Sequence, residues 1–197
     1  MTKNSYSVWS LSDDFQINNT NPNPSSVWSY GNKKEILGPF TLYTQLLADP
    51  KNSGVYAWYE TGVNWDTPGN WLGVYYNSKT TSVNLTYPSQ IITFPPHGVA
   101  MQSGNDSRFS VARYTTPIDG IYNITATFTR IDIDSNTTNA STGVYIIYKN
   151  YQLFVNNIYG MRGATLFNTS INLKANEVID FIVGVGPDKI DKYDMTN

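Results

Sequence analysis

The sequence predicts an all-β protein, an antiparallel two-sheet β-sandwich of the jelly-roll type, formed by residues 1–197 as a single domain. Apolar and polar residues alternate with period two along most of the chain, as in half-buried strands. The alternating runs are rich in Val, Ile, Thr, Tyr and Phe. Clusters of Gly, Pro, Asn and Asp separate these runs at intervals typical of a sandwich, and no stretch has helical periodicity over about ten residues.

These runs define about ten strands. The clearest is residues 120–132, in which apolar residues occupy one face and Asn or Thr the other; the apolar positions are Tyr122, Ile124, Ala126 and Phe128. Residues 44–51 are expected to form one helical turn. Asn150 is expected to adopt a positive φ in a tight hairpin between two strands. The other runs cover residues 40–47, 54–60, 71–77, 108–114, 143–149, 151–157, 164–173 and 177–185.

The composition excludes several functions. Cysteine is absent, so the chain has no disulfide framework, thiol nucleophile or cysteine zinc site. With a net charge of -2 and 14% charged residues, no basic field exists to bind nucleic acid. No stretch approaches the roughly 18 apolar residues that would predict membrane insertion. The start of the chain has no apolar region of signal-peptide length.

Catalytic residues are also scarce. His97 is the single histidine, so a multi-histidine metal site cannot form. We expect it to hydrogen-bond a loop carbonyl, with a role as a catalytic base as the alternative. The glutamates, Glu35, Glu60 and Glu177, suggest no pair of facing catalytic carboxylates. The protein is therefore not expected to be an enzyme.

Several motifs together resemble one family. "DDF", "NPNPSSVWSYG", "GPFTLYT", "FPPHG", "FSVARYTTPIDGIYNITATFTRID", "EVIDFIVGVG" and "YDMT" follow in the order seen in β-sandwich modules of large secreted bacterial surface proteins, including PEP-CTERM proteins. The resemblance implies a jelly roll similar to carbohydrate-binding modules. It also implies a non-catalytic adhesion or carbohydrate-binding function, with a glycan or cell-surface polysaccharide as partner and an extracellular or virion or cell-surface location.

The chain departs from these modules at its end. They usually continue past the "D-x-T" block into a last strand, whereas this sequence stops at Asn197, so we expect a final sheet edge that is missing or completed by another chain. Unpaired edges and many tyrosines also suit subunit contacts. The alternative function is thus a structural virion or fibre-head protein, a homo-oligomer that assembles through its sheet edges.

The candidate sugar site is the loop at residues 62–71. Trp65 lies among polar residues, where an exposed indole could stack on a pyranose ring. The surrounding polar and aromatic rim is Asn64, Asp66, Asn70 and Trp71. The alternative is that Trp65 folds back to plug its own loop.

The resemblance to carbohydrate-binding jelly rolls implies a structural Ca²⁺ as cofactor where the first and last strands meet, since hard oxygen ligands there can tie two chain ends together. Its candidate ligands are Asp13, Asp14 and Asp194, with Asp188 or Asp191 as completion. The alternative is that these aspartates cap turns, with Lys189 and Lys192 neutralising them.

Four further side chains are assigned structural roles. Trp28 and Tyr30 are two residues apart, so they share a strand face and are expected to close one corner of the core. Trp9 is interpreted in the same way. Arg113 lies among apolar residues of a strand, and we expect it to pair with Asp132 or Asp134, with a ligand contact as the alternative.

Overall fold

Fifteen β-strands form the protein in a computed structural model that describes residues 7–17, 23, 26–65, 71–88, 90–133, 140–190 and 194–197, and none of these residues is helical. The strands are β1 (Trp28–Lys33), β2 (Thr41–Leu42), β3 (Gln45–Ala48), β4 (Val55–Tyr59), β5 (Gly73–Asn77), β6 (Val83–Tyr87), β7 (Gln90–Phe94), β8 (Val99–Gln102), β9 (Phe109–Thr115), β10 (Gly120–Thr129), β11 (Asp132–Ile133), β12 (Ser141–Tyr148), β13 (Tyr151–Tyr159), β14 (Ala164–Leu173) and β15 (Val178–Val185). The all-β prediction is confirmed.

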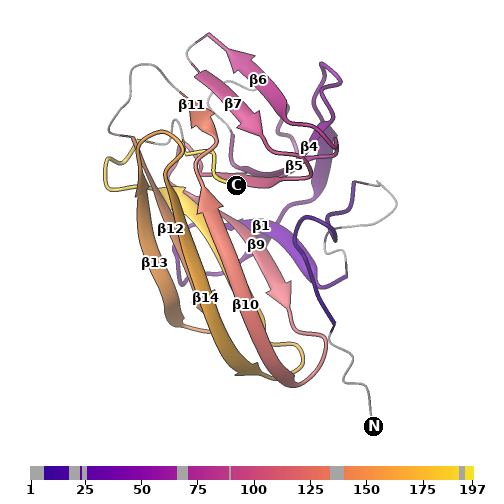
Figure 1. Ribbon diagram of the computed structural model, residues 1–197, viewed down its shortest axis with the longest axis vertical. Helices are drawn as coiled ribbons and strands as arrows, with labels where there is room; N and C mark the ends of the chain where they lie inside the picture. Colours follow the sequence, from indigo (N-terminus) through magenta and orange to yellow (C-terminus); the bar gives the residue numbers. More distant parts are fainter. Residues whose placement is uncertain are drawn as a thin grey trace.

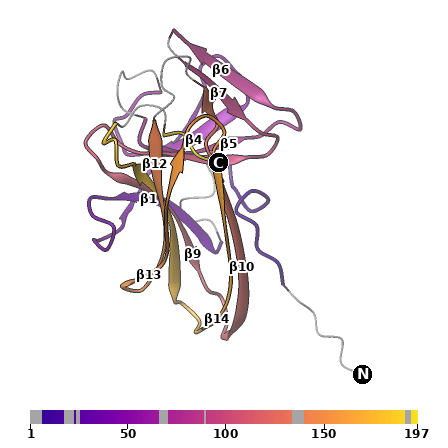
Figure 2. The same cartoon turned by 60° about the vertical axis from the view of Figure 1, so that its left-hand side comes forward.

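One layer of the molecule is a six-stranded antiparallel sheet in the order β13-β12-β15-β9-β1-β2. Its central strands carry alternating apolar side chains, so both faces are covered. Ile179 and Val183 point into the main core, while Ile182 on the opposite face packs with Val111 and Ile147. Figures 1 and 2 show this layer facing the ribbon of β10 and β14.

The facing layer consists of the two-stranded sheet β10-β14 and the four-stranded sheet β3-β4-β5-β8. Residues 194–197 join them, because Thr196 forms bridges to both Met101 of β8 and Arg130, which directly follows β10. In Figure 1 the C-terminus lies beside the upper end of β10, between the two groups of strands.

A third sheet, β11-β7-β6, covers the outer face of the four-stranded sheet. Alternate residues of β4, β5 and β8 therefore point into two different cores: Trp58, Val74 and Met101 into the main core, and Ala57, Tyr75 and Ala100 into a second core with Ile92 and Phe94 of β7. The prediction of half-buried strands is wrong for the four-stranded sheet, since both of its faces are buried.

Two local predictions are wrong. Within residues 44–51, the segment Gln45–Ala48 is strand β3, whose pairing with β4 overrides any local preference for a helical turn. The hairpin between β12 and β13 forms as predicted, but the residue with positive φ is Lys149 and not Asn150. A positive φ at the first position of a two-residue loop and not at the second is typical of a type II′ turn. Lys149 Nζ forms an ion pair with Glu177 Oε1 at 2.8 Å.

Within the described part of the chain, we find no helix with the length and apolarity that crossing a membrane would require.

Candidate binding groove

Among the described residues, strand β10 has a neighbouring strand along one edge only, and we call the other its free edge. It pairs with β14 from Gly120↔Leu173 to Thr129↔Ala164. Successive residues of an antiparallel strand direct their N–H and C=O groups to opposite sides. Thr129 exchanges two hydrogen bonds with Asn197, at 2.7 and 2.8 Å, on the side away from β14. The backbone N–H and C=O groups of Ile121, Asn123, Thr125 and Thr127 therefore point to this same side, away from β14. They have no backbone partner among the described residues.

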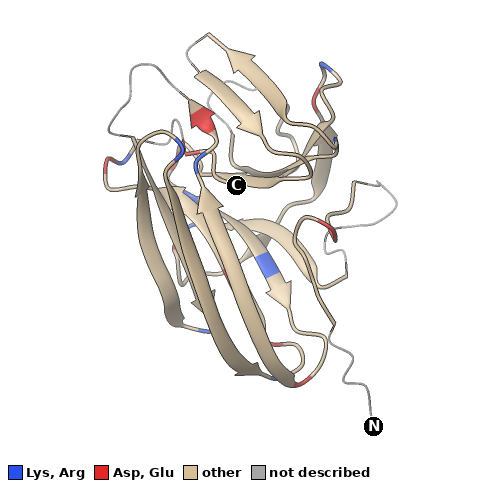
Figure 3. Ribbon diagram, in the orientation of Figure 1, with Lys and Arg blue, Asp and Glu red and all other residues tan. Residues whose placement is uncertain are grey.

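This edge lacks the usual protection against pairing with another chain. Proteins commonly protect a sheet edge with charged side chains, proline, a bulge or a very short strand. β10 is 10 residues long, contains no charged residue or proline, and pairs with β14 without a register shift. By contrast, the pairing of the long edge strand β13 with β12 is irregular at Ile146 and Ile147. Figure 3 shows how sparse charge is along β10 and β14.

A groove of about 1020 Å³ runs beside the free edge. One wall is the inward face of β10, whose residues are Tyr122, Ile124, Ala126 and Phe128. Tyr114 of β9 and Ile179 and Phe181 of β15 also line it, and residues 7–12 and 95–99 complete it. The groove is thus the open side of the sandwich, where the layer containing β10 lacks a further strand among the described residues.

Aromatic side chains hold the walls of the groove in place. Trp9 is half-buried and stacks on Tyr122, with ring centroids 5.8 Å apart and planes at 30°, and also contacts Tyr114 at 6.0 Å. Trp28 lies behind Tyr114 at 5.1 Å, and its Nε1 donates to Asp14 Oδ2 at 3.3 Å. The prediction that Trp28 and Tyr30 are core residues is confirmed, since both are buried. Trp9 packs against the same core while lining the groove.

The groove is nearly uncharged. Among its described lining residues, the acidic and basic side chains are Asp119 and His97. The carboxylate of Asp119 accepts hydrogen bonds from the Ala175 backbone N–H and from Lys174 Nζ, at 2.8 and 2.9 Å, and both contacts lower its pKa. This charge is therefore already compensated, so the groove is suited to an uncharged, partly apolar occupant.

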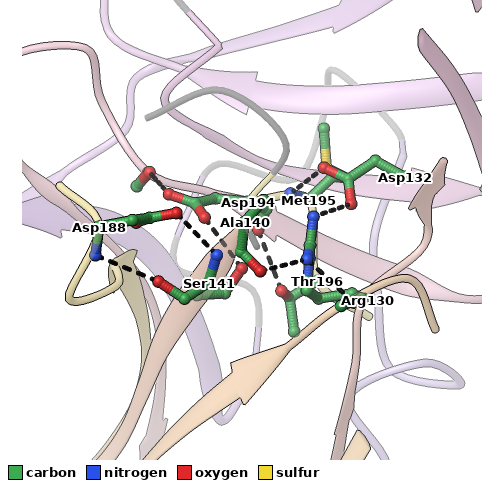
Figure 4. Close-up of polar contacts among 11 residues, drawn as sticks. Arg130, Asp132, Ala140, Ser141, Asp188, Asp194, Met195 and Thr196 are labelled. Atoms are coloured by element: carbon green, nitrogen blue, oxygen red, sulfur yellow. Dashed lines mark hydrogen bonds and ion pairs between the residues drawn. The ribbon is translucent and has the colours of Figure 1, made fainter. Parts of the chain in front are cut away.

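Residues 194–197, which end beside the groove, are anchored by a buried polar cluster (Figure 4). The Arg130 guanidinium donates to the carbonyls of Ala140 and Gly160 at 2.7 and 2.9 Å and to Asp132 Oδ1 at 3.3 Å. Asp132 Oδ2 in turn accepts the Met195 N–H at 3.1 Å. Asp194 accepts hydrogen bonds from Ser103 Oγ at 2.8 Å and Thr142 Oγ1 at 2.9 Å. These contacts fix the segment that sets the hydrogen-bonding phase of the free edge.

The two buried carboxyl groups, of Asp194 and Asp132, differ in whether a cation lies beside them. Burial raises the pKa of Asp194 from its usual 3.8 to about 8, opposed by its hydroxyl donors and reinforced by the nearby Asp132 and Asp188. Burial also raises the pKa of Asp132, but Arg130 acts in the opposite direction. Because a guanidinium cannot lose its proton in a protein and needs a counter-charge, we assign the negative charge to Asp132 and the proton to Asp194.

This assignment predicts a loss of stability as pH rises. The folded protein keeps the Asp194 proton to about pH 8, whereas the unfolded chain loses it near its usual 3.8, so the stabilisation is complete below that value and is lost as pH approaches 8. Asp194→Asn keeps the shape without the titration. Between about pH 5.5 and 7.5, we expect the unfolding free energy of the wild type to fall by about 2 kcal/mol relative to this variant in urea titrations. Parallel pH profiles would contradict the assignment.

Trp65 is not exposed, contrary to the expectation that its loop presents it to solvent. Its side chain is 5% exposed and belongs to the second core. The indole makes edge-to-face contacts with Tyr59 and Tyr75, at centroid distances of 6.1 and 5.9 Å. The expectation failed because residues near it in the sequence are polar, whereas the residues that bury it come from β4 and β5. The alternative, in which Trp65 plugs its own loop, matches this burial.

The other candidate sugar-binding residues do not form a rim around an accessible tryptophan. Trp71 is partly buried edge-to-face against Tyr87, at 4.9 Å, and its carbonyl accepts the Tyr75 hydroxyl at 2.7 Å. Asn64 is exposed. Asp66 and Asn70 lie outside the described residues. The observation that motivated a sugar site in this loop therefore does not hold.

The candidate calcium ligands are divided between two places. Asp13 is exposed, and Asp14 accepts the Ser10 N–H at 3.0 Å within a turn beside Trp28. Asp194 is instead buried with Asp132 and Asp188. Asp191 lies outside the described residues. No group of three or more histidine or acidic side chains arranged to hold a metal ion is found in the described part of the chain, and the calcium site stays a prediction.

The structure also gives partners to Arg113 and His97. Arg113 binds Asp180 through Nε and Nη2 at 2.6 and 3.0 Å, and Lys33 binds the same carboxylate at 2.7 Å. The predicted partner Asp132 is wrong, because it pairs with Arg130; Asp134 lies outside the described residues. The His97 backbone accepts the Ser12 hydroxyl at 2.5 Å and donates to Lys79, while its Nδ1 contacts the Tyr76 hydroxyl at 3.3 Å.

No family model, curated protein or solved structure matches the chain. The resemblance to secreted bacterial modules therefore stays an expectation from the sequence motifs. Fold and groove together define the class as an all-β, sandwich-like protein with an unprotected strand edge beside an apolar groove.

Sequence reasoning did not single out the groove. The uncharged alternation of residues 120–132 is a local signal for a strand without edge protection. Which strand lies beside it, however, depends on pairings between residues far apart in the chain, such as Thr129 with Asn197.

Proposed function

We propose that this protein is a non-catalytic assembly module that binds another polypeptide in the groove beside β10. The observation that carries the proposal is the run of backbone groups at Ile121, Asn123, Thr125 and Thr127 that have no backbone partner in the described part of the chain, beside a groove with few charged side chains. A sugar or a lipid tail cannot satisfy evenly spaced N–H and C=O groups in this way, whereas another backbone can. Of the two functions expected from the sequence, assembly through a sheet edge is therefore the better supported.

The jelly-roll topology belongs to this proposal. It is supported by the strand order of the six-stranded sheet, in which β15 lies between β12 and β9, and β9 between β15 and β1. Such long connections between antiparallel neighbours are typical of Greek-key and jelly-roll sandwiches. A surface location, where a partner chain can reach the groove, completes the proposal.

Selection from a display library of random peptides of 10 residues, the length of β10, tests the function. Ala126→Phe is the counter-selection target, because Ala126 lines the groove and the larger side chain would fill it. Asn168→Phe is the matched control, since Asn168 is exposed on the outward face of the neighbouring strand β14 and does not line the groove. We expect peptides whose affinity falls about tenfold or more with Ala126→Phe and stays within about twofold with Asn168→Phe.

Three outcomes would contradict the proposal. One is a failure to enrich any peptide over the counter-selection. A second is equal binding to both variants, which would place the peptide elsewhere. The third is affinity for glycans on an array, lost with Ala126→Phe, which would make the groove a carbohydrate site and restore the other expected function.

A further inference from the structure

We infer that the partner binds as an extended β-strand that adds to β10, antiparallel to it, and continues the line of residues 194–197. This inference rests on the proposed function and specifies the partner's conformation, direction and side-chain pattern. It starts from pairing within the molecule itself: Ile131 N–H donates to the Met195 carbonyl at 2.9 Å, and Thr129 exchanges hydrogen bonds with Asn197.

The existing pairs fix the phase of the added strand. Ile131 and Thr129 form the existing bonds on this side. In an antiparallel pair the bonding positions recur at every second residue, so the next ones along β10 are Thr127, Thr125, Asn123 and Ile121. Every second residue of a partner strand must therefore lie opposite one of these positions, with both its N–H and its C=O directed at β10. The alternate residues direct their backbone groups away from β10.

The direction follows from the same segment. Residues 195–197 run antiparallel to residues 129–131, and the pairs that β10 and its neighbours form in the described residues are antiparallel too. Asn197 closes one end of the groove, with its Nδ2 on the Val99 carbonyl at 2.6 Å. An antiparallel partner therefore has its N-terminal end beside Thr127 and its C-terminal end beside Ile121.

The side-chain pattern follows from the two faces of β10. Inward positions of the partner lie level with Ile124 and Ala126 and face Tyr114 and Phe181, so they are apolar. Outward positions continue an exposed, uncharged surface that is mostly polar, with the apolar Ile121 and Leu166 at its ends. Its polar residues are Asn123, Thr125, Thr127, Asn168, Ser170 and Asn172. The recognised sequence is an uncharged segment in which apolar residues alternate with Ser, Thr, Asn or similar residues.

A proline substitution at the free edge tests strand addition. Thr125→Pro removes an N–H that has no backbone partner among the described residues, and the proline ring obstructs the approach of a strand. Thr125→Ala keeps the N–H and is the matched control. For a peptide selected as above, fluorescence polarisation should show a dissociation constant raised about tenfold or more by Thr125→Pro and changed less than about twofold by Thr125→Ala.

Modified peptides make the same test on the unaltered protein, in case Thr125→Pro does not fold. Two versions of the peptide are compared, one N-methylated at the odd positions and one at the even positions, so that each lacks every second N–H donor. We expect one version to lose affinity by about tenfold or more and the other to retain it. Because the chain contains no cysteine, Thr127→Cys and Ile121→Cys each provide a single thiol for disulfide trapping. A peptide with an N-terminal cysteine should be trapped by Thr127→Cys in preference to Ile121→Cys.

The outcomes separate the two proposals. Binding that is lost with Ala126→Phe but insensitive to Thr125→Pro and to N-methylation in either phase would leave a polypeptide in the groove and overturn strand addition. Preferential trapping at Ile121→Cys would overturn the antiparallel direction. If the selection yields no peptide, the proposed function itself fails. Self-association of the protein that is abolished by Thr125→Pro would identify the added strand as one from a second copy.

Discussion

Replacing Trp65 with Ala is expected to lower the free energy of unfolding by about 3–5 kcal/mol, the range for truncating a buried large aromatic side chain. Trp65 is 5% exposed and packs edge-to-face on Tyr59 and Tyr75 in the second core. Its removal leaves a cavity between the loop and the four-stranded sheet, and both rings lose an aromatic contact. Equilibrium urea unfolding followed by intrinsic fluorescence measures the loss.

Trp71→Ala is the control for this variant. Trp71 is the same residue type in the same region but is only partly buried against Tyr87, so we expect a smaller loss, about 1–2 kcal/mol. A Trp65→Ala protein of nearly unchanged stability would show that the indole is accessible, and a sugar-stacking role for it would have to be considered again.

The second large effect is expected from Asp132→Asn, which should cost about 3–5 kcal/mol by removing a buried carboxylate that pairs with the guanidinium of Arg130. Arg130 and Asp132 are 2% and 1% exposed. The guanidinium cannot be neutralised by losing a proton, and the carbonyls of Ala140 and Gly160, which also accept hydrogen bonds from it, carry no charge. The cost should appear at both pH 5.5 and 7.5, unlike the effect of Asp194→Asn, which depends on pH.

Asp106→Asn is the matched control, because Asp106 and Arg108 form an Arg–Asp pair with the same separation in sequence. Their Nε–Oδ2 distance is 2.6 Å, the Asp106 side chain is 49% exposed, and Arg108 has a second partner in Glu60. We expect a change within about 0.5 kcal/mol. If Asp132→Asn were equally mild, the charge assignment in the buried cluster would be wrong.

Local pattern was sufficient to predict the strands but not their neighbours. The alternation in residues 120–132 correctly predicted that Tyr122 and Phe128 face the core and that Asn123 and Thr125 face solvent, because period two is a property of the strand itself. The same kind of pattern could not show that β4, β5 and β8 are buried on both faces. That burial depends on the third sheet, whose position is set by contacts distant in sequence.

The site predictions failed for a related reason. Trp65 was judged by the polar residues beside it in the sequence, and Asp194 by its place near the end of the chain. Their environments are set by Tyr59 and Tyr75 in one case and by Ser103 and Thr142 in the other. The sequence motifs did not point to the edge of β10, which is located by the pairing of Thr129 with Asn197.

Amide hydrogen exchange along β10, measured residue by residue by NMR, tests the central claim most directly. In the free protein we predict fast exchange at Ile121, Asn123, Thr125 and Thr127, whose N–H groups face the free edge, and slow exchange at Tyr122, Ile124, Ala126 and Phe128, which bond to β14. Adding a peptide selected against the groove should slow the first set and leave the second unchanged. Slow exchange of the first set in the free protein, or fast exchange that persists in the complex, would contradict strand addition at β10.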